Sequence, residues 1–89
     1  LMRLGRHDAA RADLDAALAA RRDWPSALIA RADLRLRTGD RDGAKADGDR
    51  AVELSPDDPY ALACRAEILL ARGDARGALR DLEQARRLA

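Results

Sequence analysis

Apolar residues recur three and four positions apart along most of the chain, which is the spacing of one face of an α-helix. Short clusters of Gly, Pro, Asp and Ser separate the helical segments from one another. Ala, Leu and Arg, which dominate these segments, stand at the top of the helix-propensity scale. The pattern predicts an all-α fold with five helices, at about residues 7–21, 25–37, 41–54, 59–72 and 75–88.

The segment boundaries carry residues that start and stop helices. Pro25 and Pro59 stand at first helical positions, where the missing backbone N–H is not needed. Gly39 and Gly73 can adopt the left-handed conformation that closes a helix. The aspartate after each of these glycines is a preferred N-cap for the next helix. Residues 55–59, rich in Pro and Asp, then form a turn that leads to the next pair of helices.

The pattern also repeats along the chain with a period of about 34 residues, a length typical of stacked helical repeats. The equivalent residues are Gly5, Gly39 and Gly73; Ala10, Ala44 and Ala78; Asp13, Asp47 and Asp81; Ala17, Ala51 and Ala85; Leu28 and Leu62; Arg31 and Arg65; Ala32 and Ala66; and Leu34 and Ile68. One unit is a pair of antiparallel helices, so the chain is a single repeat domain. It holds the second helix of an incomplete unit at 1–24, a full unit at 25–58 and a unit lacking only its end at 59–89.

These residues resemble the tetratricopeptide repeat family over essentially the whole chain. The likeness rests on the small Ala32 and Ala66 in the first helices, the Gly–Asp turns, the paired alanines of the second helices and the unit ending at residues 52–56. Alanine at such positions lets two helices pack closely. The resemblance implies an α-solenoid of about two and a half repeats that acts as a non-catalytic protein–protein interaction module.

The chain departs from the family pattern in the middle unit. Gly48 stands where the other units have Leu14 and Leu82, at a position that the family fills with a large apolar side chain. We expect either close packing with a neighbouring helix or a small cavity there, with close packing as the default.

Hairpin geometry predicts two ion pairs inside the units. Folding the helices about the Gly–Asp turns places Arg31 close to Asp47, and Arg65 close to Asp81. The alternative is solvated charges, whose pairing contributes at most about 1 kcal/mol. Asp13 should lack such a partner, because its arginine would lie in a helix before Leu1.

By the same resemblance, the first helices line a concave groove that binds an extended peptide or a helix of a partner protein. The residues expected on this face are Ser26, Ile29, Ala30, Asp33, Arg37, Tyr60, Ala63, Cys64, Glu67 and Ala71. The acidic Asp33 and Glu67 favour a neutral or basic segment over an acidic one. Alternatively, Asp33 pairs with Arg37 one turn away on a solvated face.

Composition excludes several other classes of function. The net charge is only +1, with one Trp, one Tyr and no Phe, which argues against binding of nucleic acid. The longest apolar runs are far too short to span a membrane, so we expect a soluble, intracellular protein. A single His and a single Cys form no metal-binding or catalytic constellation. Glu67 should raise the pKa of Cys64. The sequence therefore predicts no metal, no cofactor and no enzymatic activity.

Two and a half units should leave apolar surface exposed at both ends, because repeats of this kind bury one face only by stacking. Leu1, Met2 and Leu4 resemble the tail of an absent first helix, which favours a piece of a longer array. The alternatives are a self-assembling unit that forms homo-oligomers through its ends, and a regulatory segment of a larger protein.

Overall fold

The computed structural model describes residues 2–88, with side chains from His7 onward. Its helices are α1 (Met2–Ala20), α2 (Pro25–Arg37), α3 (Arg41–Leu54), α4 (Pro59–Ala71) and α5 (Ala75–Leu88). Within residues 2–88 there is no strand. The chain is therefore an all-α helical repeat of five helices, as predicted from the sequence.

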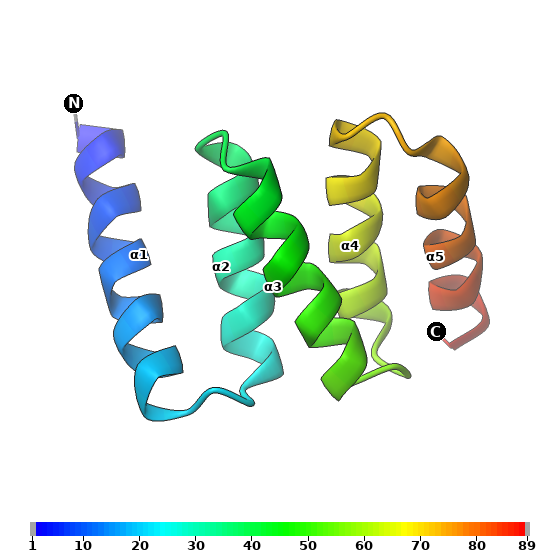
Figure 1. Cartoon of the computed structure of the whole chain (residues 1–89), viewed down its shortest axis with the longest axis horizontal. Helices are drawn as coiled ribbons and strands as arrows, with labels where there is room; N and C mark the ends of the chain where they lie inside the picture. The colour runs from blue at the N-terminus through cyan, green and yellow to red at the C-terminus, as the bar shows by residue number, and fades with distance from the viewer. Residues whose placement is uncertain (1, 89) are drawn as a thin grey trace.

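The helices form two layers (Figure 1). The helices α2 and α3 form one antiparallel hairpin, α4 and α5 form the next, and α1 packs only on α2. The first helices of the two units, α2 and α4, contact each other. Over residues 2–88, successive second helices, α1, α3 and α5, make no such contact. The stack therefore curves with α2 and α4 on its inner side.

Each hairpin turn is closed by hydrogen bonds that a glycine makes possible. Gly39 and Gly73 have φ values of 91° and 84°, in the left-handed region. The Asp40 N–H donates to the carbonyl oxygen of Arg35 at 2.8 Å, which gives this carbonyl in the last turn of α2 a hydrogen-bond partner. The Asp40 carboxylate then accepts the N–H of Gly43 at 2.9 Å and caps α3. Equivalent bonds form one period later, at Asp74, so the two hairpin turns have the same structure.

Helix boundaries differ from the expected ones mainly at the N-terminal end. The helix α1 begins at Met2 instead of His7, so Gly5 lies inside a helix and forms no turn. The residues before Gly5 include Met, Arg and Leu, which have high helix propensity. The helices α1 and α4 each end one residue earlier than expected, at Ala20 and Ala71. Shifts of one residue are common where the last turn of a helix loosens.

The core is built from small side chains. Its two clusters of buried residues are Leu18, Ala27, Leu28, Ala51 and Ala61, and then Ala32, Ala44 and Ile68. Among the residues described, Ile68 is the one large side chain that is fully buried. Alanine-rich contacts of this kind bring helix axes close together.

Gly48 lies at a close approach of α3 and α4. A Cβ atom at Gly48 would lie 3.0 Å from Cδ1 of Ile68 and 3.8 Å from Cα of Arg65. The middle unit therefore has a glycine because α3 packs closely on α4, which agrees with the default expectation.

Candidate protein-binding groove

The inner face of the stack is hollowed between α2 and α4. The hollow has a volume of about 360 Å³. It is lined by Ser26, Ile29, Ala30 and Asp33 from α2, and by Tyr60, Ala63, Cys64 and Glu67 from α4. The structure thus brings together most of the residues expected in the groove, because positions three and four apart on adjacent helices share one face.

Arg37 and Ala71, the other two residues expected there, do not line the hollow. Both lie in the last turn of their helices, beyond Asp33 and Glu67. Arg37 Nε donates to Asp33 Oδ2 at 3.0 Å, an exposed pair one helical turn apart. This pair partly neutralises Asp33, whereas Glu67 has no ion-pair partner among the side chains described from His7 onward.

One edge of the groove is aromatic. The Tyr60 side chain is 78% exposed in the first turn of α4. The Asp58 carboxylate accepts the Tyr60 N–H at 2.9 Å and fixes that turn. An exposed ring on a rigid helix end is available for apolar contacts and for contacts with cations.

Cys64 lies half-buried in the wall of the groove and is a free thiol. Its Sγ donates weakly to the carbonyl oxygen of Ile29 at 3.8 Å. Burial raises the pKa of Cys64 to about 11, and the charges of Asp33 and Glu67 contribute to that rise. The thiol is therefore protonated at neutral pH and is a poor nucleophile. The two carboxylates make this part of the groove acidic.

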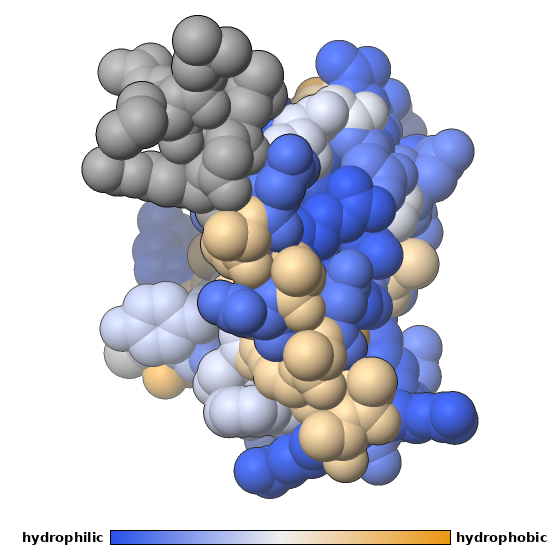
Figure 2. All heavy atoms as spheres, turned by 90° about the vertical axis from the view of Figure 1, so that its left-hand side faces the viewer, coloured by the Kyte–Doolittle hydropathy of each residue, from blue (hydrophilic) through white to orange (hydrophobic). Residues whose placement is uncertain are grey.

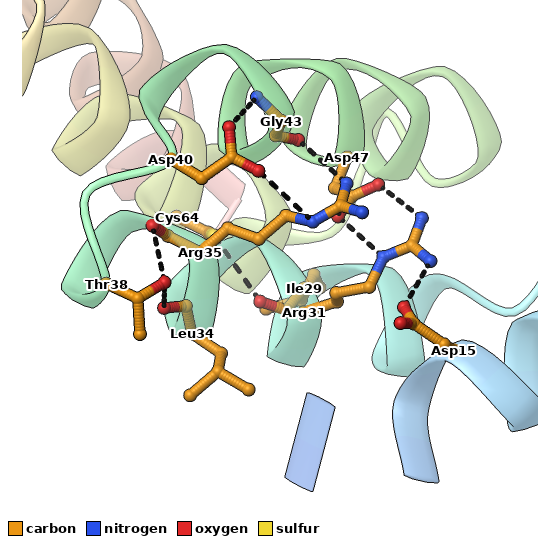
Figure 3. Close-up of polar contacts among 10 residues, drawn as sticks. All are labelled: Asp15, Ile29, Arg31, Leu34, Arg35, Thr38, Asp40, Gly43, Asp47 and Cys64. Atoms are coloured by element: carbon orange, nitrogen blue, oxygen red, sulfur yellow. Dashed lines mark hydrogen bonds and ion pairs between the residues drawn. The ribbon is translucent and has the colours of Figure 1, made fainter. Parts of the chain in front are cut away.

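A network of arginine and aspartate holds α2 and α4 in place behind the groove. Arg31 Nε and Nη2 donate to the two carboxylate oxygens of Asp47, both at 2.8 Å (Figure 3). Arg65 makes the same two bonds to Asp81, at 2.7 and 2.8 Å. Both pairs expected from the hairpin geometry are thus present. Asp47 is only 4% exposed, so this is not an interaction of solvated charges.

The same arginines also reach the preceding unit. Arg31 Nη1 donates to Asp15 Oδ1 on α1 at 3.0 Å (Figure 3), and Arg65 Nη1 lies 3.8 Å from Asp49 Oδ1 on α3. The hydrogen bond with Asp47 is the main cause that raises the pKa of Arg31. Sequence reasoning missed these contacts between units, although Asp15 and Asp49 are one repeat period apart.

A second arginine on α2 joins the network. Arg35 Nη1 donates to Asp47 Oδ2 at 3.1 Å, so Asp47 accepts from two guanidinium groups (Figure 3). Asp13, the equivalent of Asp47 in α1, is exposed and has no ion-pair partner among the side chains described from His7 onward.

Two other kinds of feature are absent from the residues that the structure describes. No group of His, Cys, Asp or Glu among them is arranged to hold a metal ion. No helix within residues 2–88 is both long and apolar enough to cross a bilayer.

Among the comparisons with known proteins, the one with solved structures found matches. No family model matches the sequence, and no curated protein matches it significantly. A crystal structure of SycD, the type III secretion translocator chaperone of Yersinia enterocolitica, in an alternative dimer, superimposes with a TM-score of 0.85 at 20% identity over 98% of this chain. MamA of MSR-1 superimposes with a TM-score of 0.82 at 19% identity over 97% of this chain.

The fold is tetratricopeptide-like. At these identities the likeness establishes the fold alone. The chain spans 66% of the SycD structure and 49% of the MamA structure.

Proposed function

We propose that this chain belongs to the tetratricopeptide repeat family. In this proposal it is a non-catalytic module that binds an extended peptide or a helix of a partner protein between α2 and α4. The observation that carries the proposal is the hollow of about 360 Å³, which has small and apolar residues at its floor and an exposed ring at its edge. The tetratricopeptide-like fold, shared with a structure described as a chaperone, supports the same function.

The chemistry of the groove selects a neutral or basic partner. Asp33 of α2 and Glu67 of α4 line the same groove as Cys64, and their charges contribute to its raised pKa. A Lys or Arg of the partner would lower the energy of both carboxylates, whereas an acidic segment would be repelled. Contact with Tyr60 would add apolar area and a cation–π interaction.

Rigidity of the walls supports binding without rearrangement. The helix α2 is fixed to α3 through Asp47, and α4 is fixed to α5 through Asp81. A preformed groove loses little conformational freedom when it binds its partner, which favours affinity.

Fluorescence anisotropy with three pools of labelled peptides, basic, neutral and acidic but matched in length, tests this function. The native chain should bind the basic pool most tightly, and Glu67→Arg should weaken that binding by about tenfold. Glu53→Arg, the same change on an exposed residue outside the groove, is the matched control and should leave binding unchanged. Tightest binding of the acidic pool, or equal losses in the two variants, would contradict the proposal.

Self-assembly is a second candidate function, because both ends of the stack are apolar. Figure 2 shows an apolar band along the α1 end, flanked by hydrophilic side chains. At the other end, Leu79 and Leu82 of α5 are 57% and 44% exposed. A mass that rises with concentration in sedimentation equilibrium would support this candidate.

A further inference from the structure

The outward face of α5 carries a second hollow, separate from the groove. Leu79, Leu82, Glu83 and Arg86 line a hollow of about 360 Å³ on it. The helix α5 contacts only α4, so this face is uncovered in the structure described. Large exposed apolar side chains framed by charged ones are typical of protein contact sites.

The α1–α2 junction shows what covers the equivalent face. Leu82 and Glu83 lie two repeat periods after Leu14 and Asp15. In that junction Leu14 packs against the core cluster that contains Leu28. Asp15 accepts a hydrogen bond from Arg31 of α2 at 3.0 Å (Figure 3).

The α3–α4 junction uses the same arrangement. Gly48 of α3 packs against Ile68 of α4, and the next residue, Asp49, lies 3.8 Å from Arg65. The two junctions share one arrangement. An uncharged residue of the second helix, Leu14 or Gly48, packs against the first helix of the next unit. The acidic residue that follows it faces an arginine of that first helix. Glu83 holds the corresponding acidic position on α5.

The remaining residues of the face define the partner further. Arg86 stands where α1 has the buried Leu18, and Leu79 stands where α1 has the exposed Arg11. The apolar contact on α5 is thus shifted by one turn toward the start of the helix. In the antiparallel arrangement of α1 and α2, residues before Asp15 lie opposite residues after Arg31. A helix that packs on α5 with its arginine opposite Glu83 therefore needs aliphatic residues one turn after that arginine, where they meet Leu79. It also needs an acidic residue one turn before the arginine, where it faces Arg86.

We propose that the α5 face, formed by Leu79, Leu82, Glu83 and Arg86, binds an amphipathic helix of another protein. The helix carries an acidic residue, then an arginine about one turn later, then aliphatic residues in the following turn. Its arginine pairs with Glu83, its acid with Arg86, and its aliphatic residues cover the two leucines.

A second copy of this chain matches that description poorly. Its first helices are internal, and their arginines, Arg31 and Arg65, are already bound to Asp47 and Asp81. At the other end of the second copy, α1 exposes Asp13, which is equivalent to the Asp47 that pairs with Arg31 of a first helix. An end-to-end stack would therefore bring carboxylates of both ends together.

The test uses a fluorescent peptide that copies residues 58–72 of this chain with Leu62→Glu and Cys64→Ala. The peptide keeps Arg65, Ile68 and Leu69 and has the required acid one turn before the arginine. Since Leu62 is 3% exposed in the core, the glutamate also prevents the peptide from replacing α4 within the fold. We expect saturable binding, with the largest backbone NMR shifts on α5.

Charge exchange identifies the contact. Glu83→Arg should weaken binding by about fivefold or more, and Leu82→Lys by about tenfold or more. A peptide that also carries Arg65→Glu should bind the native chain weakly and the Glu83→Arg chain more tightly. Glu53→Arg serves as the control and should have no effect.

Three results would overturn the proposal. The first is NMR shifts confined to α2 and α4, together with a loss of peptide binding in Glu67→Arg. The second is equal affinity of the native chain for the peptides with and without Arg65→Glu. The third is a dimer of the free chain that dissociates in the Leu82→Lys variant. The first would place the peptide in the groove, and the third would make a second copy the occupant. None of them would contradict binding of a partner in the groove, so the two proposals fail separately.

Discussion

A single buried carboxylate connects three helices at the residue scale. Asp47 accepts from Arg31 and Arg35, and Arg31 in turn donates to Asp15. Each partner offsets the cost of removing a charge from water, which is large for an isolated carboxylate. The network therefore depends on Asp47 more than on any one arginine, because both guanidinium groups share that carboxylate.

Replacing Asp47 with Asn should lower the free energy of unfolding by about 2–4 kcal/mol. The substitution keeps the size of the side chain but removes the buried counter-charge that Arg31 and Arg35 share. Urea denaturation followed by circular dichroism measures the loss. Asp33→Asn, which breaks an exposed pair with Arg37, is the matched control and should cost less than about 0.5 kcal/mol. Equal costs would show that the network contributes no more than a surface pair.

Cys64 gives a prediction that depends on pH. Its pKa of about 11 lies above the ordinary value of 9.0, so the folded state favours the neutral thiol. The resulting stabilisation is complete below pH 9.0 and is lost as the pH rises from there toward 11. Alkylation by iodoacetamide should accordingly have its midpoint near pH 11 in the folded chain and near pH 9.0 in urea. A midpoint that is the same in both states would contradict this assignment.

The acidic neighbours of Cys64 can be tested separately from burial. Glu67→Gln should lower the midpoint of alkylation, because it removes a negative charge that raises the pKa of the thiol. Glu53→Gln, on the outer layer, should leave it unchanged. If neither variant moves the midpoint, burial alone accounts for the shift and the groove is less negative than proposed.

Contacts within a hairpin could be predicted from the sequence, whereas contacts between units could not. A two-helix turn with a glycine fixes which residues lie opposite each other, and this places Arg31 beside Asp47. The bond from Arg31 to Asp15 depends on how one unit is rotated against the next, and that rotation follows from packing of side chains. The participation of Arg35 depends on its rotamer, which no sequence pattern reports.

At the element scale, the distance between α3 and α4 depends on Gly48. Since a Cβ atom there would already be tight against Ile68, Gly48→Leu should destabilise the chain by about 1–3 kcal/mol through overpacking. The helix itself tolerates leucine, because α1 and α5 have Leu14 and Leu82 at this position. The cost therefore belongs to the junction and not to helix propensity.

A compensating substitution tests whether the loss of stability comes from overpacking at the α3–α4 junction or from helix propensity. Ile68→Ala removes the side chain that the new leucine would strike, so the double variant should be more stable than the sum of the two single losses predicts. Denaturant unfolding of the four proteins gives the coupling energy. Additive losses would mean that α3 and α4 move apart without a local clash.

Helix ends were predictable wherever a capping residue was present. Asp40 and Asp58 each accept a backbone N–H at the start of a helix, and the glycine turn after α2 has the expected geometry. The start of α1 has no such signal, because Gly5 lies within a run of good helix formers. The resemblance to tetratricopeptide repeats implied the groove, and the helical period placed its residues on one face. Arg37 and Ala71 were included only because that period continues past the end of the hollow.

The whole molecule is a stack in which each helix depends on its neighbours. The helices α2, α3 and α4 each contact at least two others, whereas α1 contacts only α2 and α5 contacts only α4. In such quasi-one-dimensional folds, stability is the sum of the units and their interfaces. The ends therefore open at a lower free energy than the middle.

The two ends should also differ from each other. In α1, Leu18 is the one residue among those described that is buried, whereas α5 buries Ala78, Asp81 and Ala85. Native-state hydrogen exchange should accordingly give the lowest protection in α1, more in α5, and the highest in α2–α4. Asp81→Asn should reduce protection in α5, because it removes the carboxylate that Arg65 binds, while exchange in α1 stays the same. Equal protection in all five helices would instead indicate that the stack unfolds as one cooperative unit. In that case binding at the α5 face would stabilise every helix equally, and loss of the Asp81 pair would lower protection throughout the chain.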